Sequence, residues 1–210
     1  MGTCIKGVIA AAGLSRRMGA FKPPMPINGR PMIERSVMSM LSADVEEVVV
    51  VLGYRAREIE EVLRQSPAAP YIRMVRNRDY LHSEMLDSIK LGVASLGPCS
   101  DFFLLPGDIP MVSPATFRAI QKTHLCGENL VTFPTVDGRR KHPPLISARC
   151  IQRILSFQEA GGLRQLWKNM EQETGNVAVD DMGCTMDVDS PGDYEKILQY
   201  LARSVRGSAV

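Results

Sequence analysis

A loop near the N-terminus contains the side chains of this sequence that are best suited to holding a phosphate chain. It follows an apolar run and combines glycines, a hydroxyl and three cations: Gly13, Ser15, Arg16, Arg17, Gly19 and Lys22. Glycine can adopt backbone angles closed to other residues and lets a ligand approach main-chain N–H groups. One arginine and the lysine can straddle a triphosphate and neutralise charge that develops on a phosphorus atom under attack. The alternative is an ordinary strand-to-helix turn with solvated arginines.

The spacing of this loop matches neither of two familiar phosphate-binding patterns. It lacks the Gly-x-Gly-x-x-Gly of a dinucleotide-binding fold and the Gly-x4-Gly-Lys-Ser/Thr of a P-loop. Dehydrogenase and ATPase functions are therefore disfavoured. The remaining interpretation is a loop that binds a triphosphate through its cations and its backbone.

Acidic residues follow two other segments in a way that suits a metal ion. Asp108 comes directly after an apolar strand-like run, in Pro106-Gly107-Asp108, and Asp187 and Asp189 alternate in an extended segment, which turns both carboxylates the same way. Mg²⁺ takes one or two carboxylates together with phosphate oxygens and waters. Asp108 and one of the other two are thus candidate ligands. The alternatives are an Asp that stabilises its own turn and surface acids near a helix N-terminus.

Polar side chains that can contact a second substrate lie around the start of a helix expected over 84–96. They are Asn77, Tyr80, Ser83 and Ser88. Capping and turn roles are the alternative for these residues. His142 follows a basic turn and either hydrogen-bonds a substrate or is a satisfied loop histidine.

Alternating strand-like and helix-like runs indicate the elements that position these residues. Strands are expected at 4–11, 47–52, 71–76 and 101–105, and helices at 31–42, 55–65, 84–96 and 114–124. This rhythm predicts βαβ units and a mostly parallel α/β sheet. Ligands of such sheets bind beyond the carboxyl ends of the strands, where the glycine loop and Asp108 are both expected.

The second half of the chain has a less regular pattern. Strands are expected at 129–134, 143–147 and near 176–180, and helices at 148–157, 162–173 and 191–202. These elements can form an extended hairpin or a lid beside the main sheet. Ser190 is the expected N-cap of the last helix, with Pro191 at its first position.

Composition limits the class of protein. The 210 residues are 45% apolar and carry a net charge of +2, which fits a globular domain with a small anionic ligand and not a nucleic-acid binder. Five scattered cysteines without a Cys-x-x-Cys indicate neither disulfides nor structural zinc. No run has the length of a signal peptide core or a membrane span, so we expect a cytoplasmic protein without membrane contact.

The ordered motifs together resemble the nucleotidyltransferases related to molybdopterin cytidylyltransferase. The matching motifs are Ala11-Ala12-Gly13-Leu14-Ser15-Arg16-Arg17-Met18-Gly19 with Lys22, Asn77-x-x-Tyr80 with Ser88, Gly107-Asp108-Ile109-Pro110, His142-Pro143 and Asp187-Val188-Asp189-Ser190-Pro191. They span roughly residues 5–200. Five motifs in the same order are far more specific than any one of them.

The resemblance implies a Rossmann-like three-layer sandwich of the nucleoside-diphosphate-sugar transferase type. It also implies transfer of a nucleotidyl group from a nucleoside triphosphate to a phosphorylated acceptor, with release of pyrophosphate. The chain would be one nucleotidyltransferase domain over 1–210, with a nucleotide-binding half at about 1–125 and an acceptor-side half at about 126–205.

Site roles carried over by the resemblance fall into three groups. The triphosphate would be held by Gly13, Ser15, Arg17 and Lys22, with Ala11, Ala12, Arg16 and Gly19 completing the nucleotide loop. Asp108 and Asp189 would hold Mg²⁺, with Mn²⁺ as the alternative ion, and Lys22, Arg17 and Asp108 would be catalytic. The acceptor would be bound by Asn77, Ser83, Ser88 and His142.

Substrate choice is also suggested by the resemblance. Ala12 stands where related guanylyltransferases usually carry a second glycine, which favours CTP as the donor. The resemblance itself implies molybdopterin as the acceptor, with a molybdoenzyme as the recipient of the product. Ser83 and Lys141 stand where the family usually has glycine, and both lie on the acceptor side. A GTP donor, a sugar-phosphate acceptor and a protein that binds nucleotide or cofactor without turnover remain the alternatives.

Overall fold

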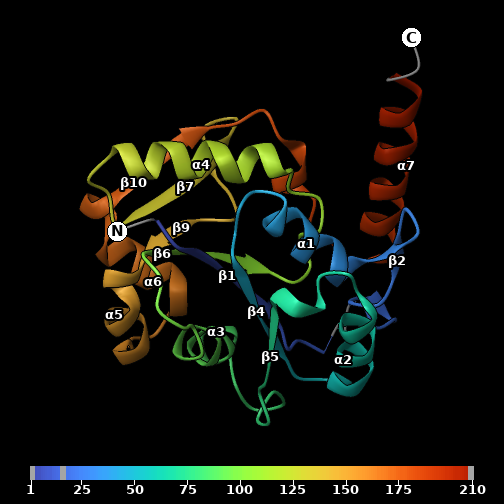
Figure 1. Cartoon of the computed structure of the whole chain (residues 1–210), viewed down its shortest axis with the longest axis horizontal. Coiled ribbons are helices and arrows are strands. Elements are labelled where there is room, and N and C mark those ends of the chain that lie inside the picture. The colour runs from blue at the N-terminus through green and yellow to red at the C-terminus, as the bar shows by residue number, and fades with distance from the viewer. Residues whose placement is uncertain (1–2, 15–17, 208–210) are drawn as a thin grey trace.

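The structure, a computed structural model, describes residues 3–14 and 18–207 and consists of a central sheet with helices on both faces (Figure 1). The strands lie side by side in the order β10 (Thr174–Ala178), β7 (Val131–Val136), β9 (Leu145–Ser147), β6 (Asp101–Pro106), β1 (Ile5–Ala11), β4 (Glu47–Leu52) and β5 (Ile72–Arg76), and β8 (Arg139–Arg140) pairs with β7. β1 is parallel to β4 and to β6, and β4 is parallel to β5. The mostly parallel α/β sheet is thus confirmed.

Successive strands are added on one side of β1 first and then on its other side. From β1 the chain moves outward through β4 to β5, and it then returns to β6 on the other side of β1. The loops after β1 and β6 therefore leave the same edge in opposite directions and open a crevice between them. In α/β folds this switch point is where ligands bind.

Alternation along the buried strands produces two cores, one on each face of the sheet. Val48, Val50 and Leu52 of β4 pack into one core, and Val49 packs into the other. The first core is covered by α1 (Met32–Leu41), α2 (Ala56–Gln65) and α4 (Pro114–Cys126). The second is covered by α3 (Met85–Ala94), α5 (Ile151–Ser156) and α6 (Gly162–Asn169). Three layers result, as the sequence predicted.

The second half of the chain extends the main sheet, so the expectation of a hairpin or lid beside it was wrong. β9 lies antiparallel between β6 and β7, with Ile146 opposite Phe102 on one side and Val131 on the other. Leu145 and Ile146 are fully buried in opposite cores. Apolar side chains on both faces of a strand require cover on both faces, which a lid would not supply.

Element boundaries differ from the sequence expectations at several helices and turns. The helix expected at 148–157 begins with a 3₁₀ turn, and the helix expected at 162–173 ends early. The additional short elements are the hairpin strands β2 (Pro26–Ile27) and β3 (Arg30–Pro31) and the 3₁₀ turns η2 (Ala69–Tyr71), η3 (Ala148–Cys150), η4 (Glu171–Glu173) and η5 (Met182–Thr185). Asn28 and Gly29 turn the hairpin with positive φ angles.

The last helix, α7 (Pro191–Gly207), is longer than expected and projects away from the rest of the molecule (Figure 1). Ser190 caps it as predicted: its Oγ accepts a hydrogen bond from the Asp193 N–H at 3.3 Å, and its own N–H donates to the Asp193 carboxylate at 3.0 Å. Val188 and Ile197 anchor its first turns against Ile27 and Met32. No helix among residues 3–14 and 18–207 is both long enough and apolar enough to cross a bilayer.

Candidate active site

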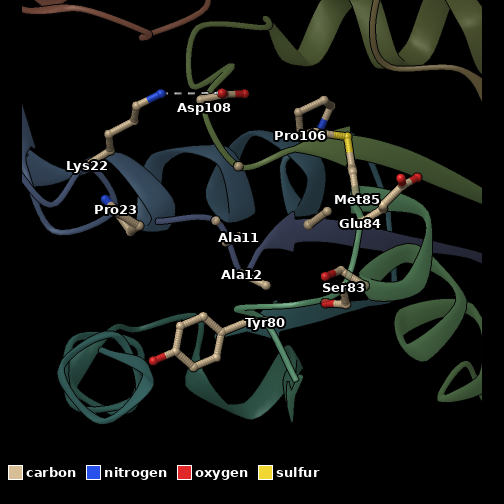
Figure 2. A pocket seen from close by; sticks show the side chains of 14 residues that line it. Ala11, Ala12, Lys22, Pro23, Tyr80, Ser83, Glu84, Met85, Pro106 and Asp108 are labelled. Carbon is tan, nitrogen blue, oxygen red and sulfur yellow. Dashed lines mark ion pairs between the residues drawn. The ribbon is translucent and has the colours of Figure 1, made fainter. Parts of the chain in front are cut away.

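A cavity of about 200 Å³ lies at the carboxyl ends of β1 and β6, at the switch point of the sheet (Figure 2). Its lining comes from the ends of both strands, from the loops after them and from the start of α3. The lining residues are Ala10, Ala11, Ala12, Gly13, Lys22, Pro23, Tyr80, Ser83, Glu84, Met85, Ser88, Pro106, Gly107 and Asp108. Nucleotide-loop, metal-ligand and acceptor candidates from distant parts of the sequence are thus brought to one cavity.

Lys22 lies between two of the predicted metal ligands. Its ammonium nitrogen is 3.0 Å from the Asp189 Oδ1 and 3.6 Å from the Asp108 Oδ2, and only 10% of its side chain is exposed. Figure 2 shows the lysine reaching across the cavity toward Asp108. A positive charge held between two carboxylates occupies the kind of position that a divalent cation would take.

The loop after β6 places Asp108 by close packing against β1. A Cβ at Gly107 would lie 2.8 Å from the Ala11 Cβ and 3.0 Å from the Ala10 carbonyl oxygen, so this approach requires glycine. Burial raises the pKa of Asp108, Lys22 acts against that shift, and the negative charges of Asp189 and Asp187 reinforce it. A nearby cation therefore stabilises the charged form of this carboxylate.

A backbone hydrogen bond joins the two acidic segments. The N–H of Val188 donates to the Asp108 carbonyl at 2.8 Å, which holds the 187–189 segment beside the loop after β6. Asp189 contacts Lys22, whereas Asp187 acts on Asp108 only through its charge. Of the two alternating acids, the structure therefore brings Asp189 to the lysine.

Glycine was expected in the nucleotide loop for its unusual backbone angles, and the structure agrees at Gly19 but not at Gly13. Gly19 has a φ of +68°, a conformation that other residues rarely adopt. Gly13 is not among the residues with positive φ, and a Cβ there would meet no atom of the described residues within 4 Å. Its backbone conformation therefore does not require glycine. The candidates Ser15, Arg16 and Arg17 lie outside the described residues.

The three acceptor candidates before and within α3 form one hydrogen-bonded group. The amide of Asn77, which is 4% exposed, donates to the hydroxyl oxygens of Ser83 and Ser88 at 2.8 and 2.9 Å. Both serines line the cavity, and Asn77 does not. Asn77 thus orients two hydroxyls that face the cavity.

His142 does not line this cavity but a neighbouring one. The adjoining cavity lies over α3 and α6 and includes Ala10, Met85 and Pro106 in its own lining. Burial lowers the pKa of His142, against a backbone hydrogen bond with Leu104, so the imidazole is neutral at pH 7. His142 therefore lies near the candidate active site, because the two cavities share lining residues.

Two aromatic residues beside the nucleotide loop, Phe21 and Tyr54, were missed by sequence reasoning, whereas their neighbour Tyr80 was among the candidates. Tyr54 lies between Phe21 and Tyr80, with ring centroids 5.5 and 6.3 Å away. A Cβ at Gly53 would lie 2.5 Å from the Ala12 carbonyl oxygen and 2.7 Å from the Tyr80 Cβ. The available signal was position: Gly53 directly follows β4, as Gly107 follows β6.

Asp108 and Asp189 fit a divalent ion whose remaining ligands come from the phosphate groups of a bound substrate. No group of three or more His, Cys, Asp or Glu side chains within the described parts of the chain is arranged to hold a metal. Asp108 and Asp189 supply two carboxylates on either side of Lys22, which matches the few protein ligands that Mg²⁺ uses together with phosphate oxygens.

Comparison with known proteins places this arrangement in context. A family model described as the MobA-like NTP transferase domain matches residues 7–174. The chain is 27% identical over 192 residues to the molybdenum cofactor cytidylyltransferase of Escherichia coli (strain K12), a match that covers 91% of this chain and 94% of that protein. It is 31% identical over 151 residues to the nicotine blue oxidoreductase of Paenarthrobacter nicotinovorans, covering 69% and 72% of the two proteins.

Solved structures agree with the architecture. A nucleotidyl transferase from Methanothermobacter thermautotroptrophicus superposes with a TM-score of 0.81 at 29% identity, and the match covers 97% of this chain and 100% of that one. The three-layer α/β fold of the nucleoside-diphosphate-sugar transferase type is thereby confirmed.

Proposed function

This chain belongs to the family of proteins with a MobA-like NTP transferase domain, and we propose that it transfers a cytidylyl group from CTP to a phosphorylated acceptor with release of pyrophosphate. The observation that carries the proposal is the meeting of Lys22, Asp108 and Asp189 at the switch point of the sheet. A lysine with two carboxylates beside a glycine loop suits a triphosphate and its cation.

Each group has a role in this proposal that follows from its charge. Lys22 binds the triphosphate and offsets negative charge in the transition state, together with Arg17 from the same loop. Asp108 and Asp189 would hold Mg²⁺, which supplies positive charge to the phosphate oxygens. The cavity-lining hydroxyls of Ser83 and Ser88 bind the acceptor. No enzyme nucleophile is needed, because a phosphate acceptor is already anionic at neutral pH.

CTP is the proposed donor and molybdopterin the proposed acceptor. Ala12 lines the cavity at the position where related guanylyltransferases usually carry glycine, and the Escherichia coli relative is named a cytidylyltransferase of the molybdenum cofactor. The nucleotide product would then pass to a recipient molybdoenzyme.

The test measures pyrophosphate release by the purified protein with Mg²⁺, molybdopterin and CTP, GTP, ATP or UTP in parallel. We expect CTP to be used most efficiently. Asp108→Asn should lower kcat/KM by about 10²-fold or more, because the carboxylate charge at the cation is lost while the side-chain shape is kept. Asp44→Asn is the matched control, since Asp44 is exposed and lies just before β4, at the opposite end of that strand from the site.

Different outcomes would contradict different parts of the proposal. Faster release from GTP would overturn the choice of donor, and release with glucose 1-phosphate in place of molybdopterin would overturn the choice of acceptor. Tight CTP binding without pyrophosphate from either acceptor would instead indicate a nucleotide-binding protein.

A further inference from the structure

The last helix contacts the chain segment that carries Lys22, at a point outside the candidate active site. The hydroxyl of Tyr194, in the first turn of α7, donates a hydrogen bond to the carbonyl oxygen of Pro26, the first residue of β2. Figure 1 shows β2 beside the start of α7, while the rest of the helix points away from the molecule. Pro26 lies four residues after Lys22, so the helix is attached close to the lysine.

The chain between Lys22 and Pro26 is stiff. Pro23 and Pro24 have φ angles fixed by their rings. The N–H of Met25 closes a turn by donating to the Lys22 carbonyl oxygen at 2.9 Å. A displacement of Pro26 is therefore transmitted to Lys22, because the residues between them have little freedom to absorb it.

The chain between Asp189 and Tyr194 is also fixed. Ser190 and Asp193 form the cap of α7, and the N–H of Tyr194 donates to the Ser190 carbonyl oxygen at 3.2 Å. Hydrogen bonds from Ser190 and Lys196 lower the pKa of Asp193 to about 2, so the capping carboxylate is charged at neutral pH. Asp189 and Tyr194 are thus the two ends of one ordered turn.

Two polar contacts join this turn to the lysine segment. Lys22 meets Asp189 at the cavity, where the ammonium nitrogen and the Oδ1 are 3.0 Å apart, and Pro26 meets Tyr194 farther from it. Met25 and Tyr194 also pack against the same apolar cluster. The ion pair alone would leave the lysine backbone free to shift, whereas the second contact limits how far the two segments can separate.

Building on the proposed function, in which Lys22 binds the triphosphate, we propose that Tyr194 is a positioning residue for Lys22. Its hydroxyl holds the lysine segment beside Asp189, so that the ammonium group stays within reach of the triphosphate. Tyr194 is not part of the cavity lining, and it therefore acts through Lys22 and not by contact with the substrate. Small displacements of a positioned charge weaken both binding and rate.

The test begins with Tyr194→Phe, which removes the hydroxyl and keeps the ring that packs against the apolar cluster. Calorimetry with CTP and Mg²⁺ on the full-length protein should show about fivefold weaker binding, the change expected for the loss of one hydrogen bond. Tyr71→Phe is the matched control. Tyr71 is 55% exposed and lies just before β5, at the end of the sheet opposite the cavity, so we expect its variant to bind CTP as the wild type does.

A second background distinguishes positioning from a merely structural role. Lys22→Met lacks the ammonium group that Tyr194 positions, so adding Tyr194→Phe to it should leave CTP affinity unchanged within about twofold. A structural role would weaken CTP binding by the same factor in the wild-type and the Lys22→Met backgrounds. Circular dichroism checks that each variant is folded before its affinity is compared.

Three results would overturn the inference. They are unchanged CTP affinity in Tyr194→Phe, equal losses in the two backgrounds, and unchanged CTP affinity in Lys22→Met. The titrations need no turnover, so they fail separately from the proposed function. A wild-type protein that binds CTP but releases no pyrophosphate with molybdopterin would contradict the proposed reaction, and the cycle of variants would still decide the role of Tyr194.

Discussion

At the scale of single residues, Lys22 is the central charged group of the candidate active site. It neutralises Asp108 and Asp189 in the structure, and the proposed reaction needs the same ammonium group on the triphosphate. If Asp108 and Asp189 hold a divalent ion as proposed, that ion and Lys22 would compete for the two carboxylates until a nucleotide binds the lysine. Such competition would couple metal binding to nucleotide binding.

Replacing this lysine should strengthen metal binding in the absence of nucleotide. We expect Lys22→Met to bind Mn²⁺ roughly tenfold more tightly, a change of about 1.4 kcal/mol, because the competing positive charge is gone. Its CTP affinity should fall. Electron paramagnetic resonance of free Mn²⁺ measures the first effect, with Lys122→Met as the charge-matched control. Weaker Mn²⁺ binding in Lys22→Met without CTP would contradict the competition.

At the scale of elements, a buried carboxylate attaches α2 to β5. Glu60 has 9% of its side chain exposed, and it binds the guanidinium groups of Arg76 and Arg64. The hydrogen bonds from Arg76 hold the pKa of Glu60 below its usual value, burial acts against that shift, and Arg64 adds to it. The charged carboxylate is therefore the form that stabilises the fold.

The sign of this shift predicts a pH-dependent loss of stability. A lowered carboxylate pKa contributes stability that is complete above the unfolded pKa of about 4.3 and is lost as the pH falls through the folded pKa. Glu60→Gln should lower the free energy of unfolding by about 1–3 kcal/mol at pH 7. The difference should vanish at the acid end, where the wild-type side chain is also neutral.

Urea unfolding between pH 3 and 7 provides the measurement for Glu60. Glu61→Gln is the matched control, because the neighbouring Glu61 side chain is 63% exposed and lies 3.7 Å from Arg64. We expect the control to stay within about 0.5 kcal/mol of the wild type. Equal losses for the two variants at pH 7 would contradict a specific role for Glu60.

At the scale of the whole molecule, the two halves of the chain share a sheet and a buried polar network. His124 of α4 pairs through Nδ1 with the Thr132 hydroxyl at 2.8 Å and through Nε2 with the Asp101 carboxylate at 3.1 Å. It thereby joins a helix and the strands β7 and β6. All three residues are buried, and the hydrogen bond between His124 and Thr132 joins the two halves, so separating the halves would break it.

We therefore expect the halves to unfold together. Trp167 fluorescence reports on the second half, and the far-ultraviolet circular dichroism signal reports on the helices of the whole chain. The two probes should give the same urea midpoint, as in a two-state transition. An earlier fluorescence transition, with most of the helical signal retained, would show that the second half unfolds by itself.

Local pattern in the sequence predicted the repeating elements well. The apolar run at 47–52 requires cover on both faces, which identifies a central strand, and Ser190 with Pro191 sets the start of the last helix. Order along the chain also predicted that the glycine loop and Asp108 would meet, since the carboxyl ends of parallel strands share one edge. These features depend on neighbours in sequence or on a general rule of topology.

Contacts between distant residues were decided only by the tertiary structure. Lys22 and Asp189 are separated by most of the chain, and no spacing in the sequence shows that their charges meet. The burial of β9 between β6 and β7 likewise depends on the order of the strands across the sheet. So does the position of α6, which lines the cavity beside the candidate active site. The sequence by itself therefore predicted a phosphate-binding loop and its candidate metal ligands. The shape and the charge of the neighbouring cavity come from packing, because side chains on separate elements become neighbours only when the sheet assembles.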